Sequence, residues 1–254
     1  MTRLPVFLGA CTCVLATALP ATAQRGPAPA STSLAADVIA LACAPAIAYD
    51  EPAIPLRISG GQDSVKRYSN APGDLVTINA GSRGGITVGQ EFYTRRVLSD
   101  HVARVGSHNP GTIRTTGWVR VWAVDDDMSL ATITHACETV DVDDYLEPFT
   151  LPVVPSPSQI TGPPERGNYG FVLSGQDRRT QFGRGDFLLI DRGTSQGVTP
   201  GARFVIYRNK NQPGNFLFQI GEGVAVDVKE DTATLHILTA LDAIGAGDYV
   251  GMRK

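Results

Sequence analysis

The sequence lacks any run of lysine and arginine residues. Its 254 residues include 22 basic and 25 acidic side chains, which give a formal net charge of −3 at pH 7. Duplex DNA and anionic membrane surfaces attract strongly basic patches, and none stands out here. We therefore expect neither a nucleic-acid-binding protein nor a membrane-surface protein.

The sequence also has no apolar run of the roughly 20 residues that a membrane span needs. Its longest apolar run covers about residues 6–19, after Arg3 and before the small residues Ala21-Thr22-Ala23. A basic start, an apolar core and an A-x-A site in this order are typical of a secretory signal peptide. We predict a signal peptide over residues 1–23, cleaved after Ala23, and hence a periplasmic or secreted protein without a membrane span.

Cysteine is scarce, with four residues in the chain. Cys11 and Cys13 belong to the predicted signal peptide, so Cys43 and Cys137 remain in an oxidising compartment. We predict a disulfide between these two; a pair of buried free thiols is the alternative. Reading Leu8-Gly9-Ala10-Cys11 as a lipoprotein cleavage box is disfavoured, because it leaves too short an apolar segment for export.

The motifs of common catalytic and metal sites are missing as well. No histidine has a second histidine or a cysteine pair at zinc-ligand spacing; the four are His101, His108, His135 and His236. Ser174 lacks the G-x-S-x-G context of a hydrolase nucleophile. The acidic stretches at 125–127 and 141–144 would meet if their strands paired, but the EF-hand pattern is absent. We predict no catalysis, no cofactor and no metal, with calcium at the acidic turns left open.

What the sequence does contain is an internal repeat. Residues 73–96 align with the residues 112 positions later, and after a variable connection the alignment resumes with an offset of 104. Upstream, SGGQD at 59–63 matches SGQD at 174–177. Three separated blocks in the same order indicate a duplicated module. We place module 1 at 56–148 and module 2 at 169–254, joined by a Pro-rich, semi-rigid linker at 149–168 and preceded by an N-terminal segment at 24–55.

The repeated residues are those that shape the backbone. A turn motif recurs in both copies through six glycines, namely Gly81, Gly85, Gly89, Gly193, Gly197 and Gly201. We expect Gly81 and Gly193 to have positive φ, a region that glycine enters without steric cost. A shared catalytic motif would have retained histidine, cysteine, serine or paired carboxylates instead.

Short apolar runs, turn residues and alternating patterns predict strands throughout both copies. The fold class is therefore all-β, with two tandem small antiparallel β-barrel or sandwich modules of about six or seven strands each. The one helix that we predict is short, at residues 34–44 before Pro45. It carries Cys43, which the disulfide with Cys137 would pin against module 1.

The repeated pattern runs from a turn through G-V-x-x-G-x-x-F-x-V-Y-R, a variable loop, G-x-x-x-V and an acidic hairpin tip to G-D-Y-V. It resembles the C-terminal β module of flagellar assembly protein T, and a similar module occurs in a pilus secretin-associated envelope protein. The second copy matches at Gly197, Val198, Gly201, Phe204, Val205, Tyr207, Arg208, Gly221, Ala233, Gly247 and Asp248. The first keeps Gly89, Phe92 and Arg96 but has Asp143 before Asp144. The resemblance implies a non-catalytic part that packs against larger envelope assemblies.

We accordingly expect a non-enzymatic, exported structural or adaptor component of a bacterial cell-envelope assembly, flagellar, pilus or secretin in type. Its β edges, and loops such as residues 98–116, would bind partner proteins. The alternative is a module that binds peptidoglycan or another glycan. Trp118 and Trp122 are the candidate glycan contacts, because their spacing places them on one face of a strand near Tyr93. Burial of both in the barrel core is the competing interpretation, and an enzyme comes third.

Overall fold

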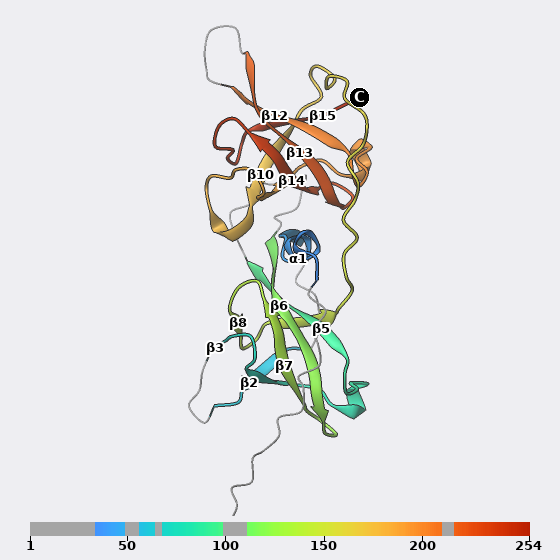
Figure 1. Cartoon of the computed structure of the whole chain (residues 1–254), viewed down its shortest axis with the longest axis vertical. Helices are drawn as coiled ribbons and strands as arrows, with labels where there is room; N and C mark the ends of the chain where they lie inside the picture. Colours follow the sequence, from blue (N-terminus) through green and yellow to red (C-terminus); the bar gives the residue numbers. More distant parts are fainter. Residues whose placement is uncertain (1–33, 49–55, 64–67, 99–110, 210–215) are drawn as a thin grey trace, which may run out of the picture. The chain divides into compact units, whose positions relative to one another are not determined.

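A computed structural model describes residues 34–48, 56–63, 68–98, 111–209 and 216–254, so the predicted signal peptide lies outside the described residues. The described chain consists mainly of strands, which confirms the all-β class (Figure 1). Its single α-helix, α1 (Ala36–Ala42), lies within the predicted helical segment and ends before Pro45. No helix in these ranges is long and apolar enough to cross a membrane.

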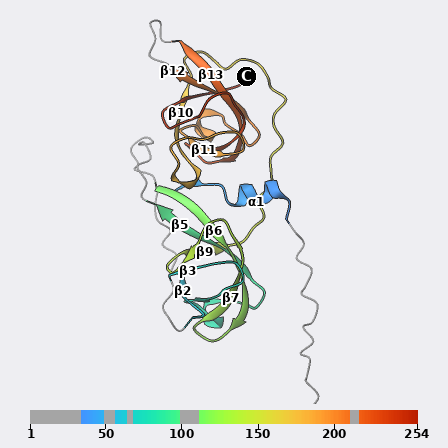
Figure 2. The ribbon, with the colours of Figure 1, turned by 60° about the vertical axis from the view of Figure 1, so that its left-hand side comes forward.

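The second repeat forms a closed barrel of antiparallel strands (Figures 1 and 2). Neighbouring strands around the barrel are β10 (Gly170–Gly175), β11 (Phe187–Ile190), β14 (Ala233–Ala240), β13 (Leu217–Val228), β12 (Arg203–Asn209) and β15 (Tyr249–Met252). The register of Gly170 with Val250 and of Phe171 with Tyr249 closes the ring between β10 and β15. Every strand therefore has a partner on both sides.

The first repeat has the same strand order. Its sheet runs through β2 (Ile58–Gly61), β4 (Leu75–Ile78), β7 (Ser129–Ala136), β6 (Gly111–Val124), β5 (Glu91–Leu98) and β9 (Tyr145–Pro148). A bridge between Arg57 and Tyr145, and a 3.0 Å hydrogen bond from the Leu146 amide to the Leu56 carbonyl, join β9 to the chain entering β2. In addition, β1 (Ala46–Ala48) pairs with β6, and β3 (Ser69–Asn70) pairs with β8 (Val140–Asp141).

Corresponding strands and turns of the two repeats are separated by the same 104 or 112 residues that separate the repeated sequence blocks. Strands β7 and β14 begin and end 104 residues apart, as do β9 and β15. The short 3₁₀ turns η1 (Ser82–Gly84) and η3 (Thr194–Gln196) lie 112 residues apart. The residues that recur in the sequence therefore form strands and turns that recur in the structure.

Each repeat encloses its own apolar core, because alternate residues of its strands point inward. Corresponding positions are buried in both, as at Phe92 and Phe204 and at Ile133 and Ile237. The apolar residues that directly follow Gly85 and Gly197, which are Ile86 and Val198, are also buried. The duplicated residues thus account for much of both cores.

Two turn glycines differ from expectation. Gly81 and Gly193 have φ values of −128° and −141°, which are extended rather than positive. Glycine is required there by a close approach: a Cβ would lie 2.1 Å from the Asp125 carbonyl oxygen in one repeat and 2.4 Å from that of Glu230 in the other. Backbone amides beside each glycine donate to the same hairpin tip, through Ser82 and Arg83 in the first repeat and Thr194 and Ser195 in the second.

Positive φ occurs instead at the later glycines of the motif. Gly85 and Gly197 have φ values of 81° and 80°, while Gly89 and Gly201 have values of 85° and 89°. Gly85 and Gly197 end the 3₁₀ turns, and Gly89 and Gly201 lie just before the next strand. In this left-handed region a side chain adds strain, which explains why glycine recurs.

Strand β6 is longer than expected and shortens the predicted loop at residues 98–116. Residues 111–116 belong to β6, where Ile113 pairs with Val97 of β5 on one side and with Ala46 of β1 on the other. Thr112 and Thr116 are buried between these neighbours. Residues 99–110 lie outside the described part of the chain.

Candidate functional site

Trp118 lies in an aromatic cluster between module 1 and the N-terminal helix. Its ring centroid is 6.2 Å from that of Tyr93 and 5.4 Å from that of Phe149. Ala42 of α1 joins the same cluster, and Trp118 is only 5% exposed. This cluster is separate from the apolar core of module 1, so Trp118 is buried by the helix rather than in that core.

Trp122 has a different environment on the same strand. It is 66% exposed and lies where the pairing of β6 with β7 shifts between Val121 and Ala123. Such a β-bulge leaves one residue outside the regular ladder. The two tryptophans therefore do not form a joint platform, and Trp122 alone can contact a ligand without rearrangement.

The predicted disulfide between Cys43 and Cys137 is present, with a Cα–Cα distance of 5.6 Å. It links the end of α1 to the residue that follows β7. The ring of His135, two residues before Cys137, stacks on Trp118 at 4.1 Å. Burial lowers the pKa of His135, which keeps its imidazole neutral at pH 7.

Each repeat contains one ion pair between a partly exposed arginine and a buried aspartate at corresponding positions. In the second repeat, Arg208 donates to both carboxylate oxygens of Asp248, at 2.9 and 2.6 Å. The first repeat has Arg96 and Asp144 at 2.7 and 3.0 Å, with a further donor in the Thr116 hydroxyl at 2.8 Å. Burial raises the pKa of Asp144, and the hydrogen bonds from Arg96 and Thr116 oppose that rise. These pairs join the start of the last strand of each repeat to the strand that carries the arginine. They link β9 to β5 in the first repeat and β15 to β12 in the second.

The two acidic stretches of the first repeat bind different arginines. Asp126 and Asp127 at the β6–β7 hairpin tip accept from Arg83 at 2.8 and 2.9 Å, and all three side chains are well exposed. The other stretch binds Arg96, through Asp141 at 2.8 Å as well as Asp144. The two stretches accordingly serve separate ion pairs.

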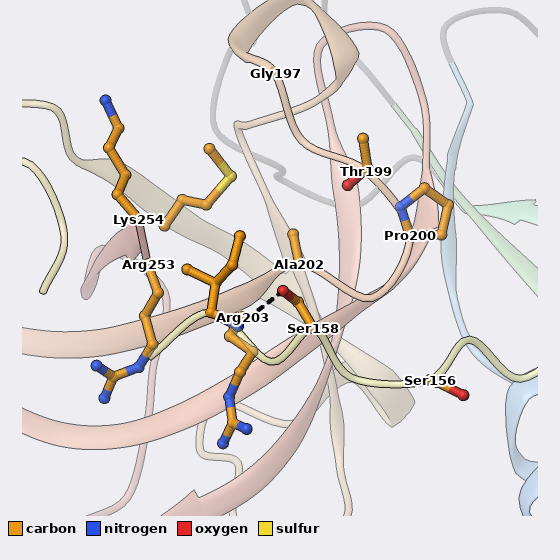
Figure 3. Close-up of a pocket in the computed structure, with 11 residues that line it drawn as sticks. Ser156, Ser158, Gly197, Thr199, Pro200, Ala202, Arg203, Arg253 and Lys254 are labelled. Atoms are coloured by element: carbon orange, nitrogen blue, oxygen red, sulfur yellow. Dashed lines mark hydrogen bonds between the residues drawn. The ribbon is translucent and has the colours of Figure 1, made fainter. Parts of the chain in front are cut away.

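The linker crosses the second barrel and covers a pocket of about 280 Å³ beside β12 and β15 (Figure 3). Figure 3 shows the side chains of Arg203 and Arg253 extending away from Thr199 and Pro200. Both guanidinium groups lie near Glu222, at 3.6 and 2.6 Å, and Ser158 accepts from the Ile160 amide at 3.1 Å. Arg203 and Arg253 are thus bound to Glu222, and the Ser158 hydroxyl is bound within the linker.

Residues 161–165 hold the linker against the barrel. Arg253 donates to the Thr161 carbonyl at 2.9 Å, and Lys254 pairs with Glu165. A Cβ on Gly251 would lie 2.8 Å from Pro164, so glycine permits this approach. The linker therefore covers the outer face of β15 at Gly251.

Beyond the covered part, an aromatic surface remains on the second repeat. It consists of Tyr169, Phe171, Tyr207 and Tyr249, and we call it the Tyr249 surface. Phe171 and Tyr249 are 4.9 Å apart between ring centroids, and Tyr169 is 5.8 Å from Tyr207 and 6.3 Å from Tyr249. Phe171 is 41% exposed, and the three tyrosines are partly exposed.

The strand pattern explains why these rings face outward. Three of these rings have a direct neighbour in the sequence that lies in the barrel core. The neighbours are Val172 after Phe171, Ile206 before Tyr207 and Val250 after Tyr249. Successive side chains alternate between the two faces of a strand, which directs Phe171, Tyr207 and Tyr249 to the outside. The sequence alone does not reveal this surface, because only the register of β10, β15 and β12 brings the three rings together.

The first repeat has no equivalent of this surface at the corresponding positions. The counterpart of Tyr249 is Tyr145, which is only 2% exposed. The counterpart of Tyr207 is Arg95, which forms an ion pair with Glu147 at 3.3 Å. The Tyr249 surface therefore belongs to the second repeat and is not part of the shared framework.

No known protein-family profile matches this chain, and no curated protein gives a significant match to it. Function must therefore be inferred from the residues of the chain itself and from their geometry.

Proposed function

We propose that this protein is an exported, non-enzymatic structural or adaptor component of a bacterial cell-envelope assembly, flagellar, pilus or secretin in type. It binds partner proteins through its β modules. The observation that carries the proposal is the Tyr249 surface. Aromatic side chains that are grouped and partly exposed are enriched in protein interfaces, where they often supply most of the binding energy.

The arrangement of charges supports a structural role. Arg96 with Asp144 and Arg208 with Asp248 each hold two strands together within a repeat. The arginines of the linker pocket are bound to Glu222. Side chains that could otherwise serve chemistry are used here to fix strands, hairpin tips and the linker in place.

The disulfide supports the proposed location outside the cytoplasm. Disulfides persist in oxidising compartments such as the periplasm and are rare in the cytosol. Cys43 and Cys137 form such a bond. Together with the predicted signal peptide and the resemblance to modules of envelope machines, this bond favours a periplasmic or secreted protein.

Site-specific photo-crosslinking in the source cells tests the adaptor proposal. A photoreactive phenylalanine analogue is placed at Phe171, and the matched control places it at Val88, which is 66% exposed in the first repeat. We expect crosslinks to flagellar, pilus or secretin proteins from position 171 and not from position 88. Equal crosslinking from both positions, or crosslinks to no envelope component, would contradict the proposal.

Binding to a glycan is the second candidate function, and the exposure of Trp122 favours it. Exposed aromatic rings can stack on sugar rings, and Trp122 is 66% exposed. Purified mature protein is sedimented with insoluble cell-wall sacculi, beside the Trp122→Ala and Phe171→Ala variants. Sedimentation that is lost only in Trp122→Ala would replace the adaptor proposal with a peptidoglycan-binding module.

A further inference from the structure

The structure places three potential metal ligands together around the disulfide. One ligand atom from each of Cys43, His135 and Cys137 lies within 4.8 Å of the other two. His135 is near the end of β7 and Cys137 follows that strand, so the two side chains are two residues apart and share one face. Cys43 comes from a different element, the end of α1.

His135 is held in a form that suits a ligand. Its ring stacks on Trp118 with an interplanar angle of 16°, which fixes the plane of the imidazole beside the two sulfur atoms. A neutral imidazole nitrogen is a common metal ligand, and its ring orientation matters for affinity. Trp118 therefore acts as a support for His135.

The sulfur atoms become ligands only after reduction, because the thiolate and not the disulfide binds metals. A dithiol reductant would donate two electrons and two protons to the Cys43–Cys137 bond, which breaks to give two thiols while the reductant becomes a disulfide. Binding of a divalent cation would then displace both thiol protons and leave two thiolates.

We propose that the reduced protein binds one thiophilic cation, of the Zn²⁺ class, through Cys43, Cys137 and His135. Two sulfur ligands and one nitrogen ligand select zinc-like ions over calcium or magnesium, which prefer oxygen. The site is closed in the oxidised protein and opened by reduction. The bound ion would replace the disulfide as the link between α1 and module 1.

The surroundings leave access for both the reductant and the ion. Cys43, His135 and Cys137 are all partly exposed. A cavity of about 250 Å³ lies beside the disulfide, and its lining includes Cys43, Cys137 and Glu138. Water in this cavity would complete the four ligands that such ions prefer.

Cobalt titration tests the proposal. The mature protein is reduced with a phosphine under argon, freed of reductant and titrated with Co²⁺, whose sulfur-to-cobalt charge-transfer absorption reports thiolate ligation. We expect one Co²⁺ per chain in the reduced protein, displaced by Zn²⁺, and no such absorption in the oxidised protein. His135→Gln should weaken binding by at least about tenfold.

His236→Gln is the matched control, because His236 also stacks on an aromatic ring, that of Phe187 at 4.9 Å, but lies in the second repeat. It should bind Co²⁺ as the wild type does. Near-ultraviolet circular dichroism of Trp118 reports whether each reduced protein stays folded. The proposal fails if the reduced wild type binds no Co²⁺, if it loses its tertiary signal and Zn²⁺ does not restore it, or if His135→Gln binds as tightly as His236→Gln.

Discussion

Arg208 and Asp248 form a bidentate ion pair between β12 and the start of β15, and the pair recurs at Arg96 and Asp144. The aspartate also accepts a backbone amide three residues earlier, from Gly245 in one repeat and from Asp141 in the other. One carboxylate therefore shapes the last turn and binds the arginine strand. This double role explains why an arginine and an aspartate so far apart in the sequence were both retained.

Asp248→Asn should lower the free energy of unfolding by about 1–3 kcal/mol, because Arg208 would lose its bidentate partner, a carboxylate that is only 9% exposed. Asp242→Asn is the control, since Asp242 pairs with the same arginine at 3.3 Å but is 52% exposed. It should cost less than about 1 kcal/mol. Urea unfolding measures both, and equal losses would contradict the central role of Asp248.

Gly193→Ala should destabilise the second repeat by more than about 2 kcal/mol, because its Cβ would overlap carbonyl oxygens of the hairpin tip. Gly183→Ala should stay within about 1 kcal/mol of the wild type, because a Cβ there has no neighbour within 4 Å. The midpoints of thermal unfolding compare the two variants. Similar midpoints would show that the hairpin tip moves to make room.

Substitutions of the two tryptophans should have clearly different effects on the free energy of unfolding. Trp118→Ala should cost roughly 3–5 kcal/mol, because it empties the cluster beneath α1. Trp122→Ala should change stability by less than about 1 kcal/mol, because this side chain is mostly exposed. Acrylamide should quench Trp122 in the folded wild type far more than Trp118. Comparable costs of the two substitutions would argue against the position of α1 over Trp118.

Tyr207 should make the stability of the protein depend on alkaline pH. Burial, with the nearby Tyr169 as a smaller cause, raises the pKa of Tyr207 above its ordinary value of 10.0. Because the pKa is raised in the folded state, the neutral phenol of Tyr207 contributes to the free energy of unfolding. This contribution is complete below pH 10 and is lost as pH rises through the folded pKa. Tyr207→Phe should flatten the decline of unfolding free energy above pH 10. If the unfolding free energy of Tyr207→Phe declines in parallel with that of the wild type above pH 10, Tyr207 is not the cause of the decline.

The repeat, the disulfide and the helix could be predicted because each depends on residues whose meaning is local or duplicated. The spacing of the shared glycines located the turns, and the two cysteines outside the predicted signal peptide could pair in one way. The signal for Asp143 was also local: it stands where the second repeat has Gly247, and both residues have positive φ, at 75° and 88°. Aspartate tolerates this conformation better than most residues.

The remaining features depend on contacts between distant segments. Gly81 is constrained by a hairpin tip more than forty residues away, so its φ could not be deduced from the turn alone. Trp118 is buried because α1 covers it, which strand periodicity does not reveal. The Tyr249 surface and the ligand group at His135 arise from strand register and from a disulfide partner far upstream.

Two repeats with the same strand order create a hazard during folding. A strand such as β4 of the first copy could pair with β14 in place of β7, because both partners present similar apolar patterns, and such misassembly is characteristic of repeat proteins. The disulfide lies wholly within the first half of the chain, where it ties α1 to the first copy. The linker is bound to the second copy through Arg253 and Lys254, so each copy has a restraint of its own against an exchange of strands.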